Sequence, residues 1–299
     1  MRGWRIKKIL NKQALKLSDK YSKEKERFHN ELSEFAQTLE QHIALNGNWT
    51  VKGFIDVFKN IYTISSDTKV ISKILELHLF PHFIDFARRI DYTIELTTHQ
   101  NWYPDLTFIN KENSEIKFAV DLKTTYINEK RPEFCNGFTL GSHGEYFINR
   151  DSSKNIQYPY SKYIGHFCLG IIYSRAMLTA EFETKKYSIE ELADIPSVIN
   201  SFRFFAIEKW RIASDKGGSG NTANIGSIKN IKDILAGNGV FAKAGEEIFD
   251  DYWANYGKIQ VESKDGNRKP MTSFDEYIKY RSLSIDIKNR KVSLKGGLE

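Results

Sequence analysis

Two aspartates and a lysine stand at spacings that could hold a cation and act on a bound substrate. Asp105 opens the segment "PDLTFI" (104–109), and Asp121 and Lys123 close the segment "IKFAVDLK" (116–123). Both segments alternate apolar and polar residues, as β-strands do. A five-residue loop between them predicts a hairpin. In that register Asp105 and Asp121 lie directly opposite, with Cβ atoms roughly 5 Å apart.

Two carboxylates so placed repel each other unless a positive charge lies between them. We expect Lys123 to lie near the pair but to be unable to bridge both, whereas a divalent cation can. Hard oxygen ligands suit Mg²⁺. The alternative is that Asp105 and Asp121 are ordinary solvent-facing strand charges with Lys123 as their ion-pair partner. The predicted register alone does not decide between the two.

The elements around this hairpin mix helices and strands without regular alternation, which predicts an α+β or irregular α/β fold. Within the hairpin, the side chains of Phe118, Val120 and Leu122 are expected to share one face, and those of Asp121 and Lys123 the opposite face. Helices are predicted over 28–45, where Asn46-Gly47 ends the helix, and over 65–80, where Ser66 or Asp67 is the cap. Further helices are predicted after Pro159 within 155–178, near Ser188, which forms a capping box with Glu191, and over 244–257. A strand is predicted over 202–213.

Composition and charge narrow the class of protein. The 299 residues can bury a sizeable core, and a net charge of +6 favours a polyanionic partner without proving one. The two cysteines, Cys135 and Cys168, are too few for a disulfide framework and lack metal-finger spacing. The longest apolar run, 167–173, is too short to span a bilayer, and no signal peptide is recognised. We therefore expect a cytoplasmic protein without a membrane partner.

A wider set of motifs resembles the type II restriction endonucleases of the PD-(D/E)xK nuclease superfamily. The superfamily signature matches Pro104-Asp105 followed by Asp121-Leu122-Lys123. The similarity extends from about residue 28 to about 281 and is carried, in order, by "SDTKV" (66–70), "QN" (100–101), "YPD" (103–105), "KTTY" (123–126), "FTLG" (138–141), "KNI" (154–156), "YP" (158–159), "GSGNT" (218–222) and "NIGS" (224–227).

The resemblance implies a restriction-endonuclease-like core with a central mixed β-sheet flanked by helices. It also implies a homodimeric, Mg²⁺-dependent enzyme that cleaves duplex DNA within a short palindrome, GATATC or a close relative, and leaves blunt ends with 5′-phosphates. A companion DNA methyltransferase would protect the host's own sites. Asp105, Asp121 and Glu76 would hold the metal, and Lys123 would stabilise developing negative charge or help set the attacking water. From the residues alone, Glu76 reads as a surface partner of Lys69 and Lys73.

The glycine-rich stretch "DKGGSGNTANIGS" (215–227) has three interpretations: a phosphate cradle, a flexible linker or a DNA-reading loop. It lacks the ending of a Walker A motif. The resemblance favours the DNA-reading loop, whose small residues let the backbone approach base edges in the major groove. The same resemblance implies DNA contacts by Gly218, Ser219, Gly220, Asn221, Thr222, Asn224, Gln100, Asn101, Thr68, Lys69, Thr124 and Thr125. His99 and Ala223 depart from the family pattern, which puts the exact recognition sequence in doubt.

The resemblance also divides the chain. Residues 1–27 form a basic extension that we expect to be partly disordered, residues 28–281 the endonuclease domain, and residues 282–299 a tail. Within the domain, 28–64 is the predicted dimerisation region and 65–281 the catalytic and DNA-recognition region. A double-strand break at a palindrome calls for two sites related by a two-fold axis. The apolar face of the helix at 28–45 is a candidate subunit interface, and its alternative is packing within its own subunit.

Two other functions remain open from the sequence. A structure-selective or repair nuclease on the same scaffold would cut without reading sequence. A DNA-binding module would keep the same charges only as structural ones. Incubation with Mg²⁺ and plasmid DNA separates these from a restriction enzyme, because each predicts a different pattern of products.

Overall fold

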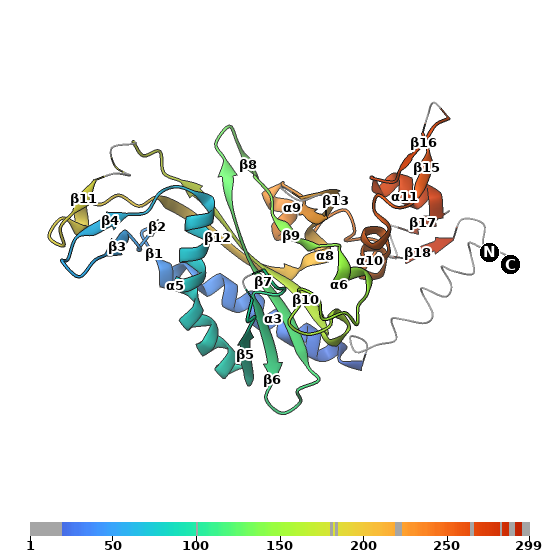
Figure 1. Cartoon of the computed structure of the whole chain (residues 1–299), viewed down its shortest axis with the longest axis horizontal. Helices are drawn as coiled ribbons and strands as arrows, with labels where there is room; N and C mark the ends of the chain where they lie inside the picture. Colours follow the sequence, from blue (N-terminus) through green and yellow to red (C-terminus); the bar gives the residue numbers. More distant parts are fainter. Residues whose placement is uncertain are drawn as a thin grey trace.

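The computed structural model describes residues 20–99, 101–179, 182, 185–218, 223–263, 266–281, 283–286 and 291–294. A mixed β-sheet runs through the middle of the molecule (Figure 1) in the order β1-β2-β12-β10-β7-β6-β5, with β8 also paired to β7. Only β10 and β7 are parallel among these pairs; the rest are antiparallel. The predicted mixed sheet flanked by helices is confirmed. Its strands are β1 (Ala44–Leu45), β2 (Asn48–Trp49), β5 (Tyr92–Leu96), β6 (Leu106–Asn110), β7 (Lys117–Asn128), β8 (Arg131–Cys135), β10 (Gly165–Arg175) and β12 (Ile199–Glu208).

Smaller sheets and helices surround the central sheet. The smaller sheets comprise β3 (Gly53–Ile55), β4 (Ile61–Thr63) and β11 (Lys186–Tyr187); β9 (Thr139–Ser142), β13 (Ala213–Gly217) and β14 (Asn224–Ser227); β15 (Gln260–Glu262) and β16 (Arg268–Pro270); and β17 (Leu283–Asp286) and β18 (Lys291–Leu294). The α-helices are α3 (Ser22–Thr38), α4 (Glu40–Ile43), α5 (Thr68–Arg89), α6 (Glu145–Ile148), α8 (Lys209–Ile212), α9 (Ile231–Leu235), α10 (Glu246–Asn255) and α11 (Phe274–Arg281), and short 3₁₀ turns cover Tyr160–Lys162 and Leu192–Asp194.

The predicted hairpin is present in the predicted register. Leu106 pairs with Val120, and Phe108 with Phe118, so the residues just before β6 approach Asp121 on β7. The Asn110 side chain closes the turn by accepting the backbone N–H groups of Glu112 and Asn113, both at 3.0 Å. This Asx-type turn fixes the loop length and therefore the register.

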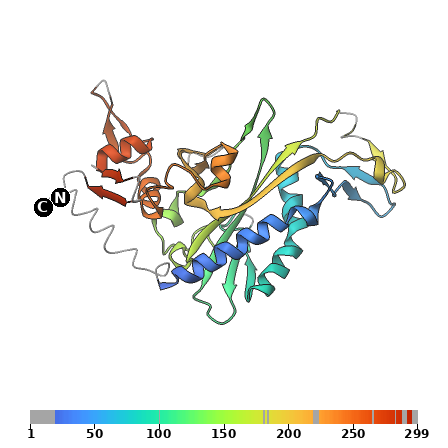
Figure 2. The ribbon, with the colours of Figure 1, turned by 180° about the vertical axis from the view of Figure 1, so that it is seen from behind.

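One face of the sheet is covered by α3 and α5 (Figure 2). Phe28 of α3 stacks on Phe118 of β7 at 4.1 Å between ring centroids and also contacts Phe167 of β10. The apolar face of α3 and α4 is buried throughout, at Phe28, Leu32, Phe35, Leu39 and Ile43. The candidate interface on that face is therefore wrong, and its alternative, packing within the same chain, is confirmed.

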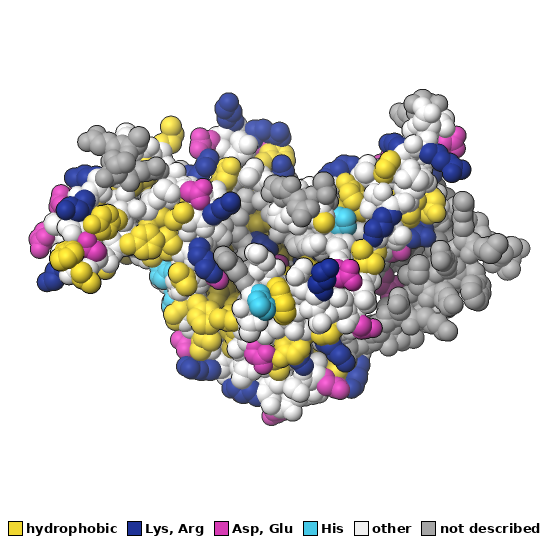
Figure 3. Space-filling model, viewed as in Figure 1, with side chains coloured by type: hydrophobic (Ala, Val, Ile, Leu, Met, Phe, Trp, Pro, Cys, Tyr) yellow, Lys and Arg dark blue, Asp and Glu magenta, His cyan; other side chains and the backbone are white. Residues whose placement is uncertain are grey.

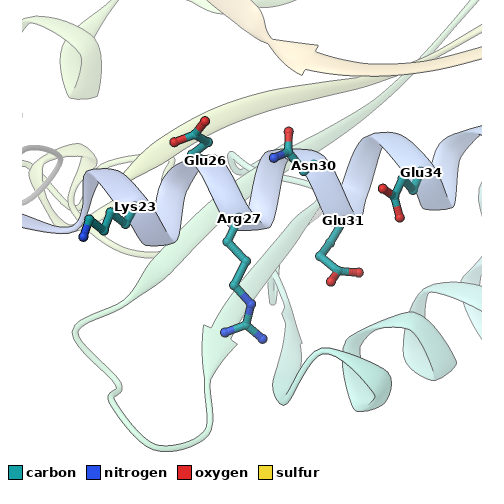
Figure 4. A pocket seen from close by; sticks show the side chains of 6 residues that line it. All are labelled: Lys23, Glu26, Arg27, Asn30, Glu31 and Glu34. Atoms are coloured by element: carbon teal, nitrogen blue, oxygen red, sulfur yellow. The ribbon is translucent and has the colours of Figure 1, made fainter.

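The outward face of α3 is charged and polar. Figure 4 shows Lys23, Glu26, Arg27, Asn30, Glu31 and Glu34 lining a shallow hollow along it. The helix also begins at Ser22, inside the segment predicted as an N-terminal extension. Asn46 and Gly47, at φ 52° and 77°, form the turn between β1 and β2 and do not directly stop a helix. An Asn-Gly pair suits this left-handed two-residue turn.

The opposite face of the sheet carries a second hydrophobic cluster. It contains Ala119 of β7, Cys168 of β10 and Ile207 of β12, packed with residues of α6, α10 and the β9-β14-β13 sheet. Asp121 belongs to this face, and its residue is only 6% exposed. The interpretation of Asp121 as a solvent-facing charge is therefore wrong, because the C-terminal half of the chain closes over it. Asp105 is partly exposed, and the ion pairs with Lys123 that this interpretation included are present.

Other predicted elements need correction. The helix predicted within 155–178 is a 3₁₀ turn followed by β10, the central strand of the sheet. The helix predicted over 65–80 is α5, capped by Asp67 as expected, but it continues through Pro81 to Arg89. Proline removes one hydrogen bond to the carbonyl of Leu77. Leu77 is exposed, so water can donate to the free carbonyl.

The strand predicted over 202–213 ends at Glu208 and is followed by α8. The capping box predicted at Ser188 forms in part: the Ser188 backbone N–H donates to the Glu191 carboxylate at 2.8 Å. The helical turn that follows covers only Leu192–Asp194.

The C-terminal elements follow the prediction more closely. The helix predicted over 244–257 is α10, and Gly257 follows it at φ 71°. Beyond α11, the segment predicted as a tail contains the β17–β18 hairpin. None of the described helices is long and apolar enough to cross a bilayer.

Candidate active site

Asp105, Asp121 and Lys123 meet at the point where β6 begins beside β7. The Lys123 Nζ lies 3.3 Å from Asp105 Oδ2 and 3.2 Å from Asp121 Oδ2. The ammonium thus bridges both carboxylates, and the expectation that Lys123 could not do so is wrong. Asp105 precedes the first residue of β6, and its side chain reaches the backbone N–H of Leu122, beside Lys123, at 2.9 Å.

The local backbone fixes both carboxylates. Asp121 Oδ1 accepts the backbone N–H of Asp105 at 3.3 Å. Tyr103, two residues before Asp105, is held between strands by donating its N–H to Asn155 at 3.0 Å and accepting the N–H of Gln157 at 2.9 Å. The Tyr103 hydroxyl lies 2.8 Å from His166 Nδ1 on β10. The acidic pair therefore stands on a fixed part of the sheet and not on a free loop.

Burial and mutual repulsion set the electrostatics of the pair. Burial raises the pKa of the Asp121 carboxyl; Lys123 opposes this, and Asp105 adds to it. Burial lowers the pKa of Lys123, but Asp121 and Asp105 outweigh burial and hold it well above its ordinary value. Lys123 therefore stays protonated, and it is the cation in direct contact with both carboxylates.

The donor set fits a hard divalent cation. Among the described residues, no group of three or more His, Cys, Asp or Glu side chains is arranged to hold a metal ion. Two carboxylates nevertheless converge on one cationic atom, the Lys123 ammonium, which occupies the place where a metal would be attracted. Mg²⁺ is commonly held by one or two carboxylates together with water and substrate phosphate. Asp105 and Asp121 match that pattern.

The comparisons with known proteins identify the family. A model described as "Restriction endonuclease EcoRV" matches residues 45–282. The chain is 40% identical over 212 residues to the type II restriction enzyme EcoRV of Escherichia coli, which covers 71% of this chain and 84% of that protein. The chain belongs to the EcoRV family of restriction endonucleases. The solved structure of the NlaIV restriction endonuclease is also similar over 86% of this chain and 91% of its own, with 11% identity and a TM-score of 0.40.

Within this EcoRV-family chain, Glu76 lies apart from the hairpin ion pairs. Its carboxylate is 2.7 Å from Lys73 Nζ on the same helix. This matches the surface pairing with Lys73 weighed from the sequence, although Lys69 is not the partner. The role of Glu76 in metal binding stays a prediction.

The residues predicted to contact DNA are placed in part. Gln100 and 219–222, the core of the glycine-rich loop, lie outside the described residues. At the two ends of that loop, the Gly218 N–H donates to the carbonyl of Asn224 at 2.8 Å, and β14 pairs with β9. Asn101 is exposed in a turn that the Trp102 N–H closes onto His99 at 3.1 Å.

The remaining predicted contacts lie on α5 and β7. Thr68 is the first residue of α5, and the Lys69 N–H donates to the capping carboxylate of Asp67 at 2.9 Å. Thr124 is partly buried, and Thr125 is 2% exposed, so the Thr125 side chain is enclosed in this conformation.

One charged residue near the site is not recognised from the sequence. Lys209 follows β12 directly and is 3% exposed, on the face of the sheet that carries Asp121. The available signal is a lysine within an apolar run, "FRFFAIEKWRIA", where a solvated charge is out of place.

Proposed function

We propose that this restriction endonuclease is a Mg²⁺-dependent homodimer that cleaves both strands of duplex DNA at GATATC or a closely related palindrome, leaving blunt ends with 5′-phosphates. The observation that carries the proposal is the convergence of Asp105 and Asp121 on Lys123 in a chain of the EcoRV family. The finer specificity follows from the resemblance at Gly218 to Thr222, with His99 and Ala223 as departures from it.

In this mechanism Asp105 and Asp121 hold the metal, and Glu76 supplies a further carboxylate. A bound divalent cation would lower the pKa of a water molecule and stabilise charge on the phosphoryl oxygens. Lys123 would supply a positive charge beside the phosphate as negative charge develops. Water attacks phosphorus, the bond to the 3′ oxygen breaks, and that oxygen takes a proton.

DNA contacts divide between sequence reading and positioning. The loop from Gly218 to Thr222, with Asn224, reads base edges in the major groove, where Asn221 can make the bidentate contact that suits adenine. Gln100 and Asn101 lie near the minor groove. Thr68, Lys69 and Thr124 contribute phosphate or groove contacts, which position the duplex without reading it.

Support for a homodimer comes from an exposed apolar patch at one end of the molecule. It is formed by Phe54, Ile55, Val57, Phe58 and Tyr62 of β3, β4 and the turn between them. Val57 and Phe58 are 89% and 82% exposed. Figure 3 shows hydrophobic side chains gathered over this end. Large exposed apolar patches mark interaction sites, and a second copy is the occupant that a palindrome requires. The patch falls within the predicted dimerisation region, 28–64.

The test is digestion of plasmid DNA of known sequence, with Mg²⁺ present or with EDTA. We expect discrete fragments in Mg²⁺ only, and sequencing of their ends should give GAT at one end and ATC at the other. Unfocused nicking would replace the proposal with a sequence-independent nuclease. Binding without cutting would leave a DNA-binding protein.

A further inference from the structure

Lys209 is a buried cation that contacts the ring of Tyr103, two residues before Asp105. It lies at the start of α8, directly after β12, and its side chain joins the covered face of the sheet. In the strand register, Asp121 is beside Cys168 of β10, and Cys168 is beside Ile207 of β12. Lys209 is two residues beyond Ile207, and its ammonium contacts rings of the same hydrophobic cluster that contains Ala119, Cys168 and Ile207 on the face of Asp121.

Aromatic rings surround the Lys209 ammonium. Its Nζ lies 4.7 Å from the ring centroid of Tyr103, 4.8 Å from Tyr160 and 5.7 Å from Phe147. Cation–π contact with these faces partly replaces water. One of the rings belongs to Tyr103, two residues before Asp105, so the cage is continuous with the backbone that carries the acidic pair.

The described residues offer the Lys209 Nζ no hydrogen-bond acceptor, although the atom is fully enclosed. The neighbouring acids have other partners: Asp250 pairs with Arg150 at 2.8 Å, and Glu246 with Lys25 at 3.0 Å. A buried charge without a direct partner destabilises a fold, so its presence calls for an explanation in function.

The charge of Lys209 acts on Asp121, and the effect is mutual. Burial lowers the pKa of Lys209 to about 8, and Asp121 is the strongest of the charges that oppose this. Lys209 in turn lowers the pKa of the Asp121 carboxyl. At pH 7 the lysine is still mostly protonated. The two carboxylates with Lys123 alone carry one net negative charge, and Lys209 offsets that charge.

We propose that Lys209 is a fixed counter-charge beneath the acidic pair that weakens divalent-cation binding by the free protein and so sets the cation concentration that the site requires. The proposal rests on the proposed function, in which Asp105 and Asp121 hold the metal. Lys209 acts through Asp121 and is a positioning residue, not a catalytic one. A cation entering a neutral site gains less Coulomb energy than one entering a negative site.

The test measures Mn²⁺ binding to the DNA-free protein at pH 7 by electron paramagnetic resonance of the free ion. Mn²⁺ serves as the probe because it accepts the same hard oxygen ligands as Mg²⁺. Lys209→Met keeps the length and apolar packing of the side chain and removes the charge, and it should bind Mn²⁺ about tenfold more tightly than the wild type. Lys209→Arg keeps the charge and should bind as the wild type does. Asp121→Asn should remove the site in either background.

The outcomes separate the two proposals. Equal Mn²⁺ affinity of the wild type and Lys209→Met, with binding still lost in Asp121→Asn, overturns the role of Lys209 and leaves the metal site standing. Absence of binding in both proteins overturns both proposals. Removal of an unpaired buried charge should leave the thermal midpoint equal or higher. If Lys209→Met and Lys209→Gln both fail to fold, the charge serves the fold, and the proposal is overturned.

Discussion

Replacement of Lys123 by methionine removes the one cation that, among the residues the structure describes, pairs directly with both aspartates. Asp121 and Asp105 then face each other with side chains that are 8% and 36% exposed. Breaking a buried ion pair on one side costs about 3–5 kcal/mol. The partial exposure of Asp105 reduces this through solvent screening, so we expect a loss of ~2–4 kcal/mol in the free energy of unfolding. For a chain of this size that corresponds to a fall in the thermal midpoint of roughly 3–6 °C.

The decisive assay is thermal unfolding of Lys123→Met with and without Mg²⁺. Without metal the variant should melt well below the wild type. Saturating Mg²⁺ should restore most of the loss, because the cation takes over the position of the ammonium, while plasmid cleavage stays absent. Lys111→Met is the matched control: its partner Asp91 is on the surface and away from the proposed metal ligands, so its midpoint should stay close to that of the wild type both with and without Mg²⁺. A Lys123→Met midpoint equal to that of the wild type, or a deficit that Mg²⁺ leaves untouched, would refute the reasoning.

Three further predictions test neighbouring parts of the account. Burial raises the pKa of Asp121, so its ionisation favours unfolding as pH rises above 3.8; Asp121→Asn should therefore lose cleavage, and its stability relative to wild type should increase from pH 4 to pH 7, whereas a constant difference in midpoint across that range would contradict this. Glu76→Gln should raise the Mg²⁺ concentration for half-maximal cleavage at least about threefold with unchanged thermal stability; unchanged Mg²⁺ dependence would leave Glu76 a surface partner of Lys73. Phe54→Asp should sediment as a monomer in analytical ultracentrifugation while Leu235→Asp, an exposed leucine on α9 outside the patch, stays a dimer; a dimeric Phe54→Asp would place the interface elsewhere.

The acidic pair could be predicted from sequence because its register depends on local chemistry. A five-residue connection and the period of two fix which residues stand opposite, and the Asn110 turn preserves both. The bridging of both carboxylates by Lys123 was not predicted. Asp105 lies just before β6, where strand alternation does not set the direction of its side chain toward Lys123. The burial of Asp121 could not be predicted from the hairpin, since the segments that cover it follow much later in the chain.

The error at 155–178 has a different origin. β10 pairs on both sides and is covered on both faces, so nine consecutive residues from Gly165 are buried. A strand buried on both faces loses the alternation that marks a strand and becomes indistinguishable by pattern from a buried helix. Its neighbour in the sheet, β12, keeps a partial alternation and was recognised up to the residue where α8 begins.

The position of α3 shows where the folding unit of this protein begins. The family match starts at residue 45, yet Phe28 inserts among Tyr92, Phe108, Phe118 and Phe167, four rings contributed by four different strands of the sheet. Truncation of the chain to the matched segment would remove α3 from that face of the sheet and expose those rings to solvent. The family match therefore begins inside the folding unit, and residues 22–44 belong to that unit as much as the segment that carries the enzyme's chemistry.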